Sequence, residues 1–88
     1  MKYIVNDFDA NRLNNAYAFL VRGGWKKLVS ENPATFIKSI SRKRAQVEFF
    51  PLTYSLSYYG EKNQVTPIVS SLLGITNGKL TTIDDRVK

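Results

Sequence analysis

Two stretches of alternating apolar and polar residues, separated by one proline, constrain the fold of this chain more than any other feature. Ala45, Val47 and Phe49 alternate with Gln46 and Glu48, and after Pro51 the residues Leu52, Tyr54, Leu56 and Tyr58 alternate with Thr53, Ser55, Ser57 and Tyr59. A period of two is typical of strands with one buried face. Because proline cannot donate a hydrogen bond to a neighbouring strand, Pro51 predicts a bend, a bulge or a sheet edge. Residues 45–59 therefore predict a bent strand in two parts or a hairpin.

Other segments show helical patterns. Leu13, Ala16, Tyr17, Leu20 and Val21 recur at the spacing of an amphipathic helix, with Asp9 as its capping residue and Gly23-Gly24 as its end. Asn32-Pro33 predicts the start of a second helix, which buries Phe36, Ile37 and Ile40 and presents Lys38 and Arg42 on its opposite face. Thr66-Pro67 opens a third helix, with Val69, Leu72 and Leu73 inside. With a short strand at Lys2–Val5, these patterns predict one α+β domain over residues 1–88, in which antiparallel strands pack with two or three helices.

Missing residue types exclude several kinds of chemistry. The chain contains no cysteine and no histidine, which removes disulfides, the usual zinc sites and the Ser–His–Asp and Cys–His mechanisms. Asp7 and Asp9 follow the first strand as paired carboxylates do in Mg²⁺-dependent nucleases, but helix capping by Asp9 is the simpler interpretation. We expect no catalysis and no cofactor. Neither a signal peptide nor a membrane span is evident, so we expect a cytoplasmic protein, in the host cytoplasm if it is viral.

Positive charge is concentrated in one window. Between Arg22 and Arg44 the chain has seven basic residues and one acidic residue, a balance of +6 that equals its whole net charge. Such a segment attracts polyanions. The residues expected to hold a phosphate backbone are Lys26, Lys27, Lys38, Arg42, Lys43 and Arg44, with Trp25 and Tyr59 as stacking faces for unpaired bases. Two alternatives to phosphate binding are that these residues form a solvated surface or that they contact an acidic protein.

The segment from Val69 to Ile83 reads Val-Ser-Ser-Leu-Leu-Gly-Ile-Thr-Asn-Gly-Lys-Leu-Thr-Thr-Ile and resembles the helix-turn-helix of DNA-binding regulators. The resemblance covers residues 66–87 and implies a second helix over about 77–87. It also implies that Thr76, Asn77, Lys79, Thr81 and Thr82 face the major groove of DNA. Two alternatives stay open. Asn77-Gly78 is also typical of a type I′ turn, with Lys79–Ile83 as the returning strand of a hairpin, and a helix pair that does not bind DNA is the other.

The leading functional hypothesis is a small basic nucleic-acid-binding protein, a transcription regulator that acts on DNA rather than RNA. Dimerisation is expected, because one short recognition helix rarely supplies enough affinity. The alternative hypothesis is a non-catalytic inhibitor or adaptor of the phage type, which binds a host protein or nucleoprotein complex in defence or transcription.

Overall fold

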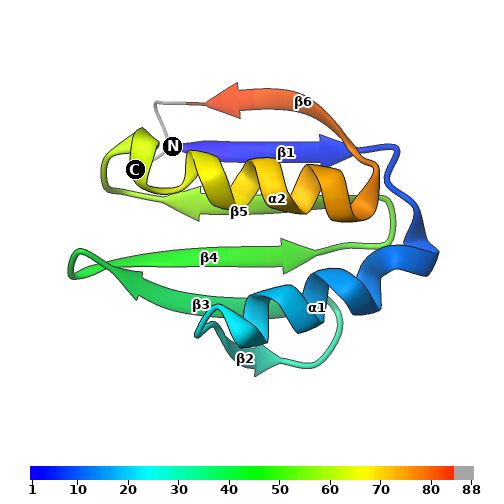
Figure 1. Ribbon diagram of the computed structural model, residues 1–88, viewed down its shortest axis with the longest axis horizontal. Helices are drawn as coiled ribbons and strands as arrows, with labels where there is room; N and C mark the ends of the chain where they lie inside the picture. The colour runs from blue at the N-terminus through cyan, green and yellow to red at the C-terminus, as the bar shows by residue number, and fades with distance from the viewer. Residues whose placement is uncertain (85–88) are drawn as a thin grey trace.

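An antiparallel sheet forms the framework of the protein (Figure 1). The computed structural model describes the backbone of residues 1–84 and the side chains of residues 1–81. The strands are β1 Lys2–Asn6, β2 Lys26–Val29, β3 Ala34–Ile40, β4 Lys43–Phe49, β5 Thr53–Tyr58 and β6 Lys79–Asp84, in the spatial order β2-β3-β4-β5-β1-β6. The helices are α1 Leu13–Arg22 and α2 Thr66–Thr76, preceded by the short 3₁₀ turns η1 Ala10–Arg12 and η2 Lys62–Gln64. The predicted α+β class is confirmed.

Both α-helices cover the same face of the sheet (Figure 1), and the core lies between the two layers. One row of facing residues across four strands shows how the core is built: Phe36, Val47, Leu56 and Tyr3 are register partners in turn, and all are buried. Alternate residues of the same strands point to the other face, which no helix of the described chain covers. Small polar residues such as Ser55 and Ser57 occupy that face.

The alternating stretch around Pro51 forms a hairpin. β4 and β5 pair antiparallel from Ala45↔Tyr58 to Phe49↔Tyr54, and the turn between them contains Pro51. The predicted buried residues are confirmed in both strands, but Leu52 is 82% exposed because it lies in the turn rather than in β5. Proline therefore separates two paired strands and takes no part in the ladder.

The helix predicted after Asn32-Pro33 is wrong, because residues 34–40 form the strand β3. Asn32 has a positive φ of 62°, and the peptide bond that follows it is cis. All seven β3 residues have register partners in β4, from Ala34↔Phe49 to Ile40↔Lys43. Thr35, Phe36 and Ile37 favour strand over helix, and the cross-strand packing that they gain outweighs the local signal of the proline.

The helix predicted for residues 77–87 is also wrong over its described part. Asn77 ends α2 in the left-handed conformation, with a φ of 55°, and Lys79–Asp84 forms β6. The hairpin alternative placed a strand correctly at Lys79–Ile83, but that strand pairs with β1 and not with the segment before the turn. The β-branched pair Thr81-Thr82 suits a strand. Residues 85–87 of the predicted helix lie outside the described residues.

The first predicted helix is confirmed as α1. The predicted cap lies one short turn earlier: Asp9 accepts a hydrogen bond from the Asn11 backbone N–H at 2.9 Å and so caps η1, whereas Arg12, the residue before α1, makes no side-chain cap. Gly23 directly follows the last residue of α1, as predicted. Ala16 and Leu20 are fully buried, whereas Val21 is 56% exposed and lies outside the core. Neither α-helix in the described part of the chain has the length and apolar character needed to cross a bilayer.

Candidate nucleic-acid interface

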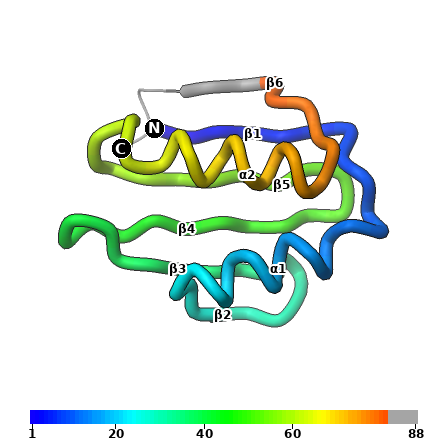
Figure 2. Tube along the Cα trace, viewed as in Figure 1, coloured from blue at the N-terminus to red at the C-terminus, as the bar shows by residue number. Residues whose placement is uncertain are grey.

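The β3–β4 hairpin extends beyond the end of its neighbour β2 (Figure 2). The first β2 residue, Lys26, pairs with Ile37, and the last three β3 residues have no partner on the β2 side. β2 cannot continue toward the hairpin tip, because the preceding Gly23-Gly24 turn brings the chain back from α1, with a φ of 89° at Gly24. A recess therefore forms where the edge of the sheet steps from β2 to β3.

Four basic side chains converge on this recess. It has a volume of about 430 Å³ and is lined by Gly24, Lys26, Ile37, Lys38, Ser39, Arg42 and Arg44. We call Lys26, Lys38, Arg42 and Arg44 the basic notch. No acidic residue lines it, and none of its four cations forms an ion pair with a carboxylate among the described residues. Uncompensated like charges gathered at one recess produce a strong positive potential there.

Cations reach the notch from both sides of the sheet. Lys26 pairs with Ile37, and Arg44 pairs with Ser39, so these two cations lie on the face away from the helices. Lys38 lies on the helix side, opposite the buried Ala45. Its Nζ atom donates a hydrogen bond to the Gly23 carbonyl oxygen at 2.6 Å. This carbonyl lies at the C-terminus of α1, where the helix dipole favours a positive charge.

Arg42 lies at the tip of the hairpin in a strained conformation. The two-residue turn has positive φ at both positions, 50° at Ser41 and 66° at Arg42, as a type I′ turn requires. Asparagine and glycine are preferred at such positions, and an ordinary residue costs about 1–2 kcal/mol in this region. The chain therefore holds an arginine where glycine would be more stable.

A network of hydrogen bonds supports the tip. The Tyr58 hydroxyl donates to the Ile40 carbonyl oxygen at 2.8 Å, and it lies 2.6 Å from the side-chain amide of Gln64. The same amide is bonded to the Ser41 hydroxyl at 2.6 Å. Tyr58 is fully buried, so these contacts join the turn to the core through Ile40 and Ser41. Sequence reasoning missed Ser41, Tyr58 and Gln64, since neither turn residue is the glycine or asparagine that marks such a hairpin.

Two residues of the predicted basic set lie elsewhere. The Nζ atom of Lys27 sits over the rings of Tyr17 and Phe36, at 5.4 and 5.8 Å from their centroids. Lys43 directs its Nζ atom toward the Tyr59 carbonyl oxygen, at 3.4 Å. The prediction that Trp25 offers a stacking face is wrong, because this side chain is only 4% exposed; Tyr59 is 52% exposed.

The C-terminal residues assigned to groove reading are not arranged as a recognition helix. Thr76 is fully buried, and its hydroxyl donates to the Leu72 carbonyl oxygen at 2.8 Å. Asn77 is the left-handed residue that ends α2. Lys79, Thr81 and Thr82 belong to β6, at the opposite edge of the sheet from β2, and the side chain of Thr82 lies outside the described part.

Asp7 and Asp9 have no third metal ligand beside them in the described part of the chain. Among those residues, no three aspartate, glutamate, histidine or cysteine side chains lie close enough together to hold an ion. Asp9 caps η1 and pairs with Arg12 at 3.4 Å.

In comparisons with known proteins, no family model, no curated protein and no solved structure matches the chain. The basic notch is the place where the structure brings together four of the six basic residues predicted to hold phosphates.

Proposed function

We propose that this protein binds the phosphate backbone of duplex DNA through the basic notch at the tip of the β3–β4 hairpin. The observation that supports this function most strongly is the convergence on one recess of four cations that, among the described residues, have no carboxylate partner and no acidic neighbour in the lining. Polyanions with closely spaced charges gain most from such a site, because each neutralised phosphate releases condensed counterions.

The side chains of the notch suit phosphates in two ways. Arg42 and Arg44 have planar guanidinium groups that can donate two hydrogen bonds to one phosphate, whereas Lys26 and Lys38 act as compact point charges. Beyond the last partners in β2 and β5, the tip of the hairpin is a ribbon only two strands wide, which is narrow enough to enter a DNA groove. The strained turn places Arg42 at the leading point of this ribbon.

Duplex DNA is favoured over a single strand by the position of the aromatic residues. Binding of unpaired bases relies on exposed aromatic faces close to the phosphate contacts. Trp25 is buried in the core, and Tyr59, although 52% exposed, does not line the notch. A duplex presents a higher charge density and needs no stacking surface. Because phosphates carry no base identity, we expect binding with little sequence preference.

The test is fluorescence anisotropy with a short labelled duplex of mixed sequence, at salt concentrations from roughly 50 to roughly 200 mM. If each of the four cations engages one phosphate, the logarithm of the affinity falls with the logarithm of the salt concentration with a slope of about −3 to −4. The double variant Arg42→Ala/Arg44→Ala should bind more weakly and reduce this slope by about 2.

The matched control is Arg12→Ala/Lys79→Ala, which removes the same charge at the opposite end of the strands. It should keep the slope of the unmodified protein. Equal losses in the two double variants would show that net charge alone attracts DNA, and absence of binding at low salt would reject the proposed function.

A further inference from the structure

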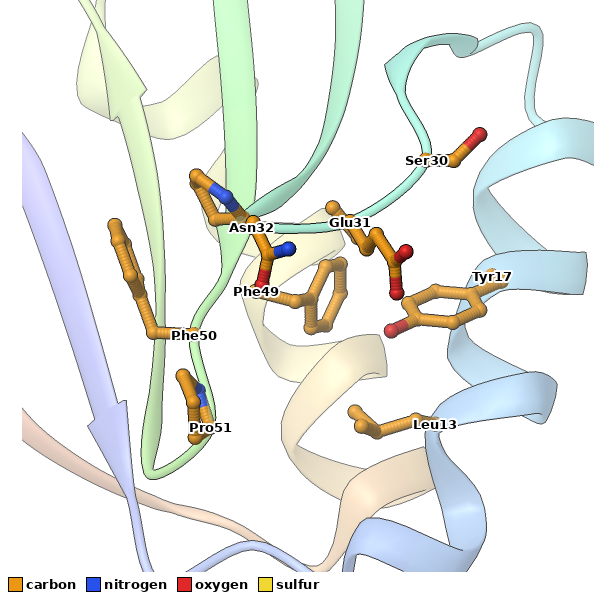
Figure 3. A pocket seen from close by; sticks show the side chains of 10 residues that line it. Leu13, Tyr17, Ser30, Glu31, Asn32, Phe49, Phe50 and Pro51 are labelled. Carbon is orange, nitrogen blue, oxygen red and sulfur yellow. The ribbon is translucent and has the colours of Figure 1, made fainter.

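A second cavity lies at the other end of β4, beside the turn that joins β4 to β5 (Figure 3). Its volume is about 520 Å³, within the range of ligand sites. It is lined by Leu13, Tyr17, Ser30, Glu31, Asn32, Pro33, Ala34, Phe49, Phe50 and Pro51. Figure 3 shows Phe50 and Pro51 on one side, Leu13 and Tyr17 of α1 on the other, and the Glu31 side chain next to Tyr17.

The lining of this cavity carries a carboxylate, in contrast to the notch. The Lys27 ammonium group lies nearby, 5.4 Å from the Tyr17 ring centroid, but does not line the cavity. Glu31 is the single charged residue in its lining, and it is also the only acidic residue between Arg22 and Arg44. Beside it, the Tyr17 hydroxyl is a neutral polar group at neutral pH, and burial raises the pKa of this phenol further above its ordinary value of 10.0. An apolar cavity with one carboxylate in its lining favours a positively charged group on an apolar stem.

The floor of the cavity is part of the packed core. The Phe49 ring packs edge-on against Tyr17, with 5.0 Å between ring centroids, and lies 5.1 Å from Tyr54. Phe49 and Tyr54 are almost fully buried in the core. A ligand therefore meets a surface that is already formed, which lowers the entropic cost of binding.

Two large apolar side chains are exposed at this end of the molecule, one on each side of Pro51. Phe50, in the lining of the cavity, is 42% exposed, and Leu52, in the lining of a neighbouring recess, is 82% exposed. Pro51 also lines this neighbouring recess, which has a volume of about 530 Å³ and contains Asp7. Exposed apolar groups that flank a cavity are typical of protein-binding surfaces, and a small free ligand would leave them uncovered.

We propose that this end of the molecule docks a segment of a partner protein in which an arginine or lysine lies between apolar side chains. The basic side chain lies along Phe49 and Tyr17 and places its charged group beside the Glu31 carboxylate. The adjacent apolar side chains cover Phe50 and Leu52. This interaction is separate from DNA binding, since the two surfaces share no residue.

The test uses a capped peptide, Leu-Arg-Phe-Leu, and the same peptide with citrulline, the neutral isostere of arginine. Binding is followed by the amide chemical shifts of the ¹⁵N-labelled protein. The arginine peptide should shift the resonances of Leu13, Ala34 and Phe50. Because Glu31 is exposed, its attraction is modest, and the citrulline peptide should bind about three- to five-fold more weakly.

Two variants make the result decisive. Glu31→Gln should bind both peptides equally, with an unchanged melting temperature because the side chain is on the surface. Phe50→Ala should weaken both peptides by a similar factor. Equal affinity of the two peptides for the unmodified protein would overturn the proposal, as would shifts confined to other surfaces. Self-association that shifts the same resonances without peptide would show that a second copy of the chain occupies the site instead.

Discussion

The ammonium group of Lys38 lies 2.6 Å from the carbonyl oxygen of Gly23. This hydrogen bond joins β3 to the C-terminal end of α1. This contact satisfies a carbonyl at a helix terminus and fixes the position of a cation that also lines the notch. One residue thus contributes to stability and to the proposed binding surface.

Replacement of Lys38 by methionine should separate these two roles. The variant loses the hydrogen bond to Gly23 and should lower the free energy of unfolding by about 0.5–1 kcal/mol, measured by urea denaturation. Lys26→Met removes a cation from the same recess without a known hydrogen bond, so its stability should stay within about 0.5 kcal/mol of the unmodified protein. Both variants should bind DNA more weakly. Equal stability of the two variants would contradict the role of the contact with Gly23.

Replacement of Arg42 by glycine should move stability and binding in opposite directions. Glycine adopts a φ of 66° without strain, so the free energy of unfolding should rise by about 0.5–1 kcal/mol while DNA affinity falls. Arg42→Ala is the control, because alanine removes the charge and keeps the strain. Thermal unfolding and anisotropy on both variants measure the two effects. A destabilised Arg42→Gly variant would show that the turn is not strained by its side chain.

Two glycines should respond to alanine with opposite signs. A methyl group at Gly60 would overlap the Tyr58 phenol, which holds the hairpin tip through Ile40 and Gln64, and should cost about 1–3 kcal/mol of stability. Gly74 is a helical residue of α2 with open space around it, so Gly74→Ala should stabilise the fold by about 0.5–1 kcal/mol. Weaker DNA binding by Gly60→Ala alone would link the Tyr58 network to the notch. If Gly60→Ala unfolds at the temperature of the unmodified protein, the Tyr58 ring is not held as described.

The stability of the protein should fall at alkaline pH through Tyr54. Burial raises the pKa of this phenol above 10.0, partly offset by its hydrogen bond with Thr76 at 2.8 Å. The folded state therefore retains the proton that the unfolded chain releases, so the stabilisation is complete below pH 10.0 and is lost as the pH rises through the higher folded value.

Tyr54→Phe isolates this contribution, because both proteins keep Tyr17, whose pKa burial also raises. The variant loses one buried hydrogen bond and should be about 1 kcal/mol less stable at neutral pH. Urea denaturation at about pH 8 and about pH 11 should show the gap between the two proteins narrowing at the higher pH. A gap that is constant or grows with pH would contradict the assigned shift.

Local sequence patterns predicted the elements whose buried residues recur at a regular spacing along the chain. The spacing of Ala16 and Leu20 indicated α1, and the alternation on each side of Pro51 indicated β4 and β5. β3 was not predictable in this way, because Asn32-Pro33 is a strong local helix signal and the pairing of β3 with β4 is decided by packing across the sheet. The hairpin alternative predicted a strand at Lys79–Ile83 but not its pairing, since its partner β1 lies at the other end of the sequence.

The composition of the notch was partly predictable from charge. Lys26, Lys38, Arg42 and Arg44 belong to the basic window of the sequence and were expected to act together, although the expected helix is absent. The location of Lys27 was not predictable. Adjacent residues of a strand point to opposite faces, so Lys26 and Lys27 separate, but which of them faces the helices depends on the register of β2 with β3. The step between β2 and β3 that forms the recess has no signal in the sequence.

Amide chemical-shift mapping of the ¹⁵N-labelled protein with a short DNA duplex tests the central claim most directly. We predict that at low salt the largest shifts occur at Gly24, Lys26 and residues 38–44, and that residues 77–82 remain nearly unchanged. The shifts should diminish as salt is added. Shifts concentrated at residues 77–82, or a salt-insensitive pattern that avoids the β3–β4 hairpin, would contradict binding of DNA by the basic notch.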